Sequence, residues 1–259
     1  MNKKRGQSLF PRVLITRPEE KASGLAEKLR ALGIRPLLFP LTQIAPPSSF
    51  DSIDKALKKW AEFDLVIFTS SLAVKFFLKR AEALNISLSE PRALYAIGPQ
   101  TKKALKASGF KRVNMAGEFR AEGLLKKLKN VRGLKILIPR AKEAREILPQ
   151  TLKARGAQVE VPAVYQVLPH QKSLLKIKRM SRKDFDAVIF SSGRSVKEFV
   201  KAFGLLKSRK LFLEIPAICI GGVTLETLEA YGIKGLKSRT PDDEGLIKTV
   251  QKALRDKNK

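Results

Sequence analysis

The sequence is poor in the residues that cross-link small domains or hold metal ions. Its 259 residues include one cysteine and one histidine. A single cysteine, Cys219, excludes a disulfide framework and a zinc ribbon. A single histidine, His170, excludes a multi-histidine metal site and argues against a Ser-His-Asp hydrolase. We expect Cys219, which lies in an apolar run, to be inert core, and His170, which follows a proline, to be exposed and structural.

Long apolar runs are also missing. No run reaches the roughly 18 residues that a membrane span needs, and no signal-peptide core follows the basic residues 1–6. These absences predict a cytoplasmic protein without a membrane partner. The hydrophobic content of 44% is that of a folded chain, and the length fits one or two domains.

Acidic residues are scarce. There are 24 of them against 52 lysines and arginines, which leaves a net charge of +28. Such a field attracts nucleic acid, an anionic surface or an anionic metabolite, and can raise association rates by about 10–10³. The alternative is a plain solubilising surface, because the lysines are spread along the chain. Aromatic residues make up only 7% and do not interleave with basic stretches, so we expect no nucleic-acid partner.

The chain repeats itself once. Three blocks recur in the same order about 123 residues apart, which indicates two duplicated domains. Each copy alternates short apolar strands with helical faces, and this predicts an α/β protein whose parallel sheets are covered by helices on both faces. The paired blocks are 13–18 and 136–141, 63–71 and 185–193, and 96–101 and 219–224.

Two segments in the duplicated chain have no helical face. Residues 35–47 and 158–169 are extended, alternating and proline-bearing, and if they pair antiparallel they form a ladder that joins two lobes. The first strand would then pack with residues after Pro169, although uncrossed halves remain the alternative. The predicted limits are 10–36 plus 171–255 for lobe 1, 48–157 for lobe 2, 37–47 and 158–170 for the ladder strands, and 1–9 and 256–259 for basic tails.

Four polar loops each follow a strand and precede a helix. Helix N-termini present unpaired N–H groups and partial positive charge, so such loops bind carboxylates or phosphates. Glycine lets a ligand approach the backbone, and the hydroxyls add donors; the alternative is that the hydroxyls are only helix N-caps. No nucleotide-binding motif is present. The candidate binding residues of these loops are Ser70, Thr101, Ser191, Ser192, Gly221 and Thr224.

Three arginines and one tyrosine complete the candidate site. Arg17 and Arg140 each end the first strand of a copy, and Arg145 follows closely, so these guanidinium groups are candidates to bind carboxylates. Ion pairs with a neighbouring Glu19 or Glu143 are the alternative for the arginines. Tyr165 lies on the second extended segment, where it can face a cleft or simply pack.

In their order and spacing, four short motifs resemble uroporphyrinogen-III synthase, the HemD family, over roughly residues 12–254. The resemblance implies two HemD-like, flavodoxin-like lobes joined by a two-stranded antiparallel ladder. It also implies an enzyme of tetrapyrrole biosynthesis, upstream of haem, sirohaem and cobalamin. The motifs are Leu-Ile-Thr-Arg-Pro at 14–18, Ile-Phe-Thr-Ser at 67–70, Ala-Ile-Gly-Pro-Gln-Thr at 96–101 and Val-Pro-Ala-Val-Tyr-Gln at 161–166.

The reaction that this resemblance implies is that of a cyclising hydro-lyase. The enzyme expels the hydroxyl of linear hydroxymethylbilane as water, inverts the terminal pyrrole through a spiro intermediate and closes the macrocycle, without metal or cofactor. Tyr165 matches the family's cleft tyrosine, a candidate proton donor, while Ser70, Thr101 and Thr224 match its loop positions.

Partners follow from the same resemblance. They are the tetrapyrrole polycarboxylate and, as a further candidate, the preceding enzyme of the pathway, and the chain is expected to be a monomer. The alternatives are a two-lobed protein that binds an anionic metabolite without converting it, and a basic nucleic-acid-binding protein.

Overall fold

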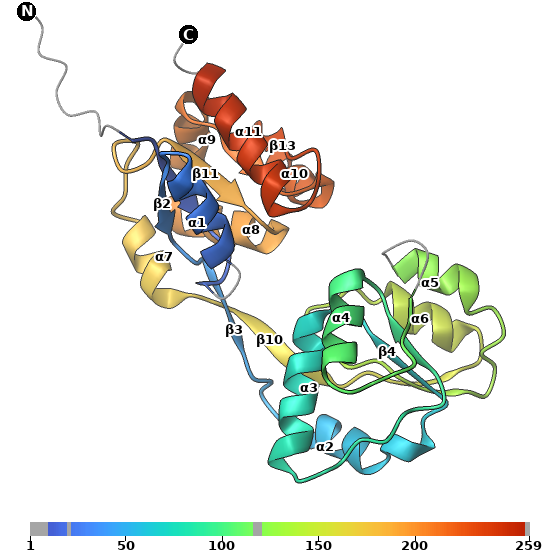
Figure 1. Ribbon diagram of the computed structural model, residues 1–259. Coiled ribbons are helices and arrows are strands. Elements are labelled where there is room, and N and C mark those ends of the chain that lie inside the picture. The colour runs from blue at the N-terminus through green and yellow to red at the C-terminus, as the bar shows by residue number, and fades with distance from the viewer. Residues whose placement is uncertain (1–9, 20–21, 116–120, 257–259) are drawn as a thin grey trace, which may run out of the picture. The chain divides into compact units, whose positions relative to one another are not determined.

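The computed structural model describes residues 10–19, 22–115 and 121–256; of the predicted basic tails, 1–9 and 256–259, only residue 256 lies within these ranges. The chain divides into two compact units (Figure 1). Lobe 1 is Met1–Gln43 with Leu168–Lys259, and lobe 2 is Ile44–Val167. The lobe limits given from the sequence stay predictions. Among the described residues, no helix is long and apolar enough to cross a membrane.

Lobe 1 is built on a five-stranded sheet in the order β13-β12-β11-β1-β2, with every neighbouring pair parallel. Strand β1 lies between β2 and β11, with Val13 opposite Ala187. The prediction that the first strand packs with residues after Pro169 is therefore confirmed. The strands are β1 (Arg12–Ile15), β2 (Arg35–Leu38), β11 (Ala187–Phe190), β12 (Ala217–Cys219) and β13 (Leu236–Lys237).

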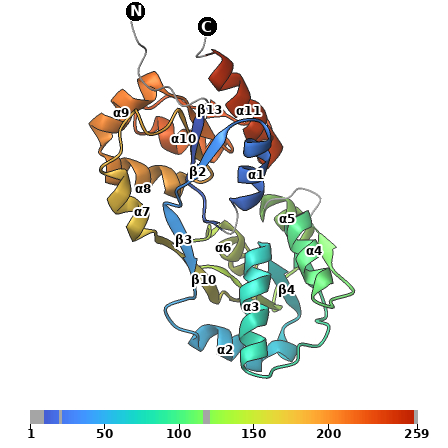
Figure 2. The ribbon, with the colours of Figure 1, turned by 60° about the vertical axis from the view of Figure 1, so that its left-hand side comes forward.

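Helices cover both faces of this sheet, as Figure 2 shows. Side chains alternate between the faces of a strand, so Leu14 joins one core while Val13 and Ile15 join the other. The face of Val13 is covered by α1 (Ser23–Ala31) and α11 (Asp243–Asp256). The face of Leu14 is covered by α7 (Gln171–Ile177), α8 (Gly193–Phe203), α9 (Leu205–Glu214) and α10 (Gly222–Glu229).

Lobe 2 has a second parallel sheet, in the order β6-β5-β4-β7-β9. Its strands are β4 (Leu65–Phe68), β5 (Leu94–Ala96), β6 (Asn114–Met115), β7 (Lys135–Leu137) and β9 (Gln158–Glu160). Helices α2 (Asp51–Lys58), α3 (Ser71–Ala83) and α4 (Pro99–Ala107) pack on one face. Helices α5 (Ala121–Lys127) and α6 (Ile147–Ala154) pack on the other.

In the two sheets, equivalent residues of the two copies occupy equivalent positions on paired strands. Val13 lies opposite Ala187 in lobe 1, and its counterpart Ile136 lies opposite Leu65 in lobe 2. In lobe 2 the strand β7 follows β6 and α5 along the chain, whereas in lobe 1 its counterpart β1 comes from the N-terminal end. One lobe is thus a circular permutation of the other.

Each predicted ladder segment is two strands rather than one. Residues 35–47 contain β2, which belongs to the lobe 1 sheet, and β3 (Thr42–Ala45). Residues 158–169 contain β9, which belongs to the lobe 2 sheet, and β10 (Ala163–Pro169). Pro40 and Pro162 lie at the breaks, where a proline removes the N–H that a continuous ladder needs.

The connecting sheet also has a third strand. Its order is β3-β10-β8, where β8 (Arg140–Ala141) pairs parallel with β10. The expected two-stranded ladder is therefore wrong in strand number, and the antiparallel direction of β3 and β10 stays a prediction. The third strand arises because the chain after β7 turns at Pro139 and adds Arg140 and Ala141 to β10.

Matched glycines end the matched helices α1 and α6. Gly33 has φ +70° and Gly156 has φ +84°. This left-handed region is open to glycine without steric cost and is a common helix stop. The two helices thus end at glycines that occupy matching positions in the two copies.

The two scarce residues are both structural. Cys219 is fully buried in β12, and desolvation raises the pKa of its thiol to about 12, so the prediction of inert core is confirmed. His170 is half-buried rather than exposed, because its Nδ1 accepts a hydrogen bond from the backbone N–H of Ser173 at 3.3 Å and caps α7. The expected exposure was wrong, and the structural role was right.

The core of lobe 1 generates a stability prediction. Phe199 is fully buried and meets the rings of Phe190, Phe203 and Phe212 at centroid distances of 5.4, 5.3 and 5.5 Å. Phe199→Ala leaves a cavity among these rings, so it should lower the free energy of unfolding by about 3–5 kcal/mol. Urea unfolding measures this. The control Leu213→Ala, 87% exposed, should change it by no more than about 0.5 kcal/mol, and an equal loss in both variants contradicts the prediction.

Candidate functional site

The strand orders place a switch point in each sheet. From β11 the chain continues to β12 on one side, and from β1 it continues to β2 on the other, so the order reverses between β1 and β11. The counterpart in lobe 2 lies between β7 and β4. Ligands of such sheets bind beyond the carboxyl ends of the strands at this point. The side chains that leave these ends are therefore the candidates for function.

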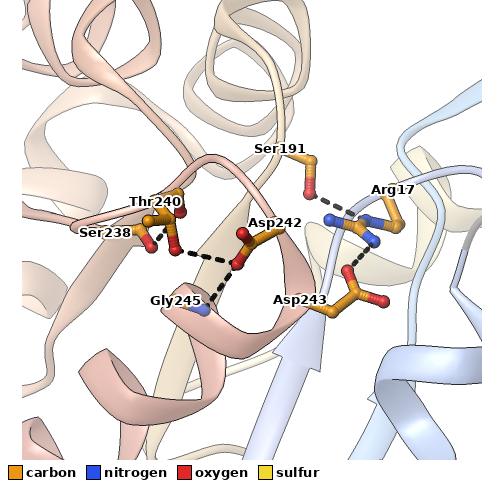
Figure 3. Close-up of polar contacts among 7 residues, drawn as sticks. All are labelled: Arg17, Ser191, Ser238, Thr240, Asp242, Asp243 and Gly245. Carbon is orange, nitrogen blue, oxygen red and sulfur yellow. Dashed lines mark hydrogen bonds and ion pairs between the residues drawn. The ribbon is translucent and has the colours of Figure 1, made fainter. Parts of the chain in front are cut away.

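In lobe 1 the switch point brings Arg17 and Ser191 together (Figure 3). Arg17 Nε donates to Ser191 Oγ at 3.0 Å, and Arg17 Nη1 lies 2.7 Å from Asp243 Oδ1. Arg17 is 9% exposed and Asp243 31%. An ion pair with the neighbouring Glu19 was the alternative from the sequence; the structure shows an ion pair with Asp243, because the fold brings the start of α11 to the end of β1.

The start of α11 is fixed by its own hydrogen bonds. Asp242 Oδ1 accepts from the backbone N–H of Gly245 at 2.8 Å and from Thr240 Oγ1 at 2.9 Å (Figure 3). These hydrogen bonds hold the pKa of Asp242 below its usual value, the bond from Gly245 being the largest cause. Asp242 thus anchors the turn from which Asp243 reaches Arg17.

Sequence reasoning missed both aspartates. Asp242 had a readable signal, since an aspartate before an acidic first turn and an apolar helical face is a helix start. Asp243 had no such signal in the sequence, because its ion pair with Arg17 joins residues 226 positions apart.

Two of the predicted serines are helix N-caps. Ser70 Oγ accepts from the N–H of Ala73 at 3.1 Å, and Ser192 Oγ accepts from the N–H of Ser195 at 3.1 Å. Each serine is the residue before its helix, α3 or α8. The capping alternative therefore holds for both hydroxyls, and a ligand role for them stays a prediction.

Two glycines hold the matching positions before α4 and α10. Gly98 and Gly221 are the N-cap residues, and a Cβ added to either would meet no atom within 4 Å, so the backbone there is uncovered. Thr101 and Thr224 lie in the first turns, each 4% exposed. The fold thus places the approachable backbone at the glycines and buries the two threonine side chains beneath it.

In lobe 2 the side chain beside the switch point is Tyr165, which lies on β10 of the connecting sheet. Its hydroxyl lies 3.5 Å from Ser70 Oγ, and its ring stacks on Phe76 with centroids 5.5 Å apart. Tyr165 is opposite Ala141 on β8 and is 8% exposed. Tyr165 is therefore packed, and its role in facing a cleft stays a prediction. Phe76 is a contact that sequence reasoning missed.

Arg140 opens β8 rather than ending the first strand of its copy, because β7 stops at Leu137 before Pro139. It is 6% exposed, pairs with Glu146 and donates from Nη1 to the carbonyl of Arg145 at 2.6 Å. Glu143, the partner in the alternative from the sequence, accepts a hydrogen bond from the N–H of Val167 at 3.1 Å. Arg140 therefore fixes its own loop, and Arg145 is exposed.

The cap at Asp242 generates a pH prediction. Its pKa is lowered on folding, so near pH 4 the unfolded chain binds more protons and stability falls as the pH drops through the folded pKa. Asp242→Asn keeps a capping side chain but does not titrate there. Urea unfolding between pH 3 and 7 should show a shallower acid loss than in the parent chain. Identical acid slopes in the two proteins would contradict a role for this carboxylate.

Comparison with known proteins gives one family. Residues 23–248 match the family model described as uroporphyrinogen-III synthase HemD. A putative uroporphyrinogen-III synthase of Methanothermobacter thermautotrophicus is 30% identical over 85% of this chain and 89% of its own length. A uroporphyrinogen-III synthase of Synechococcus elongatus is 33% identical over 72% of each chain.

A solved structure shares the fold. A mutant uroporphyrinogen III synthase of the extremely thermophilic bacterium Thermus thermophilus aligns with a TM-score of 0.70 over 95% of this chain and 99% of its own, at 22% identity. The matched model spans both lobes and includes the loops after β4, β5, β11 and β12. The chain therefore belongs to the uroporphyrinogen-III synthase (HemD) family.

Proposed function

We propose that this chain converts linear hydroxymethylbilane to uroporphyrinogen III, with loss of water and inversion of the terminal pyrrole ring. Family membership supports the reaction class. The observation that carries the assignment of an acid is the position of Tyr165, beside Ser70 at the switch point of lobe 2.

The surroundings of Tyr165 suit a proton donor. Ser70 Oγ already accepts from the N–H of Ala73, so its own proton is available to donate to Tyr165 Oη. In that arrangement the tyrosine proton points away from Ser70 and can pass to the departing hydroxyl. The C–O bond of the hydroxymethyl group then breaks, water leaves, and the electron-rich pyrrole carries the positive charge until a carbon of the terminal pyrrole attacks. The proton that the macrocycle loses on closing restores the phenol of Tyr165. The stack on Phe76 fixes the ring that delivers the proton.

The substrate that the family implies carries two carboxylates on each ring. Positive groups at both switch points can hold them: Arg17 with Ser191 in lobe 1, and the exposed Arg145 in lobe 2. The uncovered backbone at Gly98 and Gly221 offers N–H donors at helix starts. The residues proposed for substrate binding are Arg17, Ser70, Thr101, Arg140, Arg145, Ser191, Ser192, Gly221 and Thr224, and Arg140 acts through the loop that bears Arg145.

Such a reaction needs a mild acid, a held conformation and exclusion of water, and no strong nucleophile. A cofactor is therefore not part of the proposal. A cytoplasmic location, a monomeric state and contact with the preceding enzyme of the pathway remain predictions.

Isomer analysis tests the function. The purified chain is incubated with freshly prepared hydroxymethylbilane, the product is oxidised, and the isomers are separated by chromatography against a protein-free control. We expect the type III isomer to dominate only where the protein is present. A protein that only binds an anionic metabolite would retain the bilane without forming type III, and that result would overturn the proposal.

A tyrosine variant tests the acid. General acid assistance typically contributes 10²–10⁴-fold, and the pyrrole nitrogen already helps expel this hydroxyl, so Tyr165→Phe should lower kcat by about 10²-fold or less with little change in KM. Thr224→Ala should lower kcat less than Tyr165→Phe does, because the N–H groups at the start of α10 remain. The matched control for Tyr165→Phe is Tyr95→Phe, at a half-buried tyrosine on β5. If Tyr165→Phe keeps kcat within twofold, the tyrosine only packs.

A further inference from the structure

Helix α9 is an element of lobe 1 with no counterpart in lobe 2. The matching stretch of lobe 2, residues 84–93 between α3 and β5, contains no helix, and its Leu84, Ile86 and Leu88 pack against the core. In lobe 1 the stretch between α8 and β12 holds the ten residues Leu205–Glu214. The repeated sheet plan therefore does not require α9, and its outward face calls for a separate explanation.

That face carries leucines that no core uses. Leu206 is 73% exposed and Leu213 is 87% exposed, and their spacing of two helical turns puts them on one ridge. Leu175 on α7 is 63% exposed. Helices α7, α8 and α9 cover the same face of the lobe 1 sheet and lie together on one side of the lobe (Figure 2). The exposed leucines thus belong to helices on one side of lobe 1.

The leucines stand among cations. The acidic residues of α8 and α9 are Glu198 and Glu214, and Glu214 is neutralised by Arg182 at 3.2 Å. Lys207 and Lys210 flank the ridge and have no acidic partner in the described ranges of the chain. The exposed lysines on these helices are Lys172, Lys176, Lys197, Lys201, Lys207 and Lys210.

We propose that the face formed by α7, α8 and α9 docks on an anionic lipid surface, with Leu206 and Leu213 entering the headgroup region. Leucines that project from a helix among lysines supply the two attractions that hold interfacial helices, which are burial of apolar groups and attraction to anionic lipid. Charge complementarity selects the lipid, since each basic residue near an anionic surface strengthens binding about fivefold. A ridge of leucines suits a bilayer, which needs no matching groove to receive it. The overall charge of +28 adds attraction at longer range.

Docking of this kind needs no membrane span. The expectation of no membrane partner came from the absence of long apolar runs, and it could not detect leucines that the fold turns outward. The proposal uses neither Tyr165 nor Arg17, so it is independent of the proposed reaction.

Vesicle co-sedimentation tests the proposal with the full chain. The vesicles are phosphatidylglycerol mixed with phosphatidylcholine, or phosphatidylcholine alone, at low salt and at about 0.15 M salt, where the Debye length is about 8 Å. We expect the parent chain to sediment with the anionic vesicles and not with the neutral ones. Lys207→Glu/Lys210→Glu should weaken binding at least about tenfold. Leu206→Gln/Leu213→Gln should also weaken it at least about tenfold, because the apolar contribution of two leucines is lost.

Two control variants distinguish an effect of this face from an effect of net charge and from an effect of exposed leucines in general. Lys103→Glu/Lys106→Glu changes two exposed lysines on α4 with the same spacing and the same change in charge. Leu32→Gln changes a leucine that is 46% exposed, next to α1 on the opposite side of the lobe 1 sheet. Both should bind vesicles within about twofold of the parent chain, and circular dichroism checks that every variant is folded.

Three results would overturn the proposal: no binding of the parent chain to anionic vesicles, equal binding to neutral vesicles, or an equal loss in the α4 control pair. The first result leaves an acidic protein as the occupant of this face. The third shows that the charge of the whole chain, and not this face, holds the lipid.

Discussion

The insertion of β1 between β2 and β11 is the constraint on which lobe 1 depends. The strand is parallel to both neighbours, and Val13, Leu14 and Ile15 are fully buried. A parallel strand inside a sheet has to satisfy hydrogen bonds on both edges and apolar contacts on both faces. Because β1 does all of this, Arg17, two residues after the strand, is held beside Ser191 and the start of α11.

The two lobes use one scaffold for two different sets of side chains. Their registers agree, so the differences between the switch points come from side chains and from the connections between strands. Lobe 1 presents a buried guanidinium paired with an aspartate from its last helix. Lobe 2 turns its matching arginine, Arg140, into a loop anchor and places the phenol of Tyr165 there instead. In the proposed function, Arg17 of lobe 1 binds carboxylate and Tyr165 of lobe 2 is the acid.

Much of the fold could be predicted because its signals are local and repeated. The offset between blocks predicts the duplication, the apolar strands predict parallel sheets, and the glycines at 33 and 156 predict helix ends. The prolines at 40 and 162 were visible as well, yet their effect on the ladder was underestimated. A proline does not by itself reveal that the chain on its two sides joins different sheets.

The site was harder to predict for a physical reason. A side chain's position relative to a strand end is local, so Ser70, Ser192 and Arg17 could be chosen from the sequence. Its partner is set by tertiary packing, so Asp243 beside Arg17, Phe76 beside Tyr165 and Glu146 beside Arg140 could not. The buried threonines of α4 and α10 show the same limit, since spacing indicates a helix start but not the depth of its side chains.

The circular permutation also sets the order in which a nascent chain can fold on the ribosome. Lobe 2 has all five strands of its sheet once residue 160 has been synthesised, so it can fold while translation continues. Strands β1 and β2 leave the exit tunnel before lobe 2. Until β11, at residues 187–190, emerges, β1 can pair only with β2. The segment that precedes lobe 2 in the chain therefore reaches its native place only after lobe 2 has been synthesised, and until then its apolar residues lack their native partners.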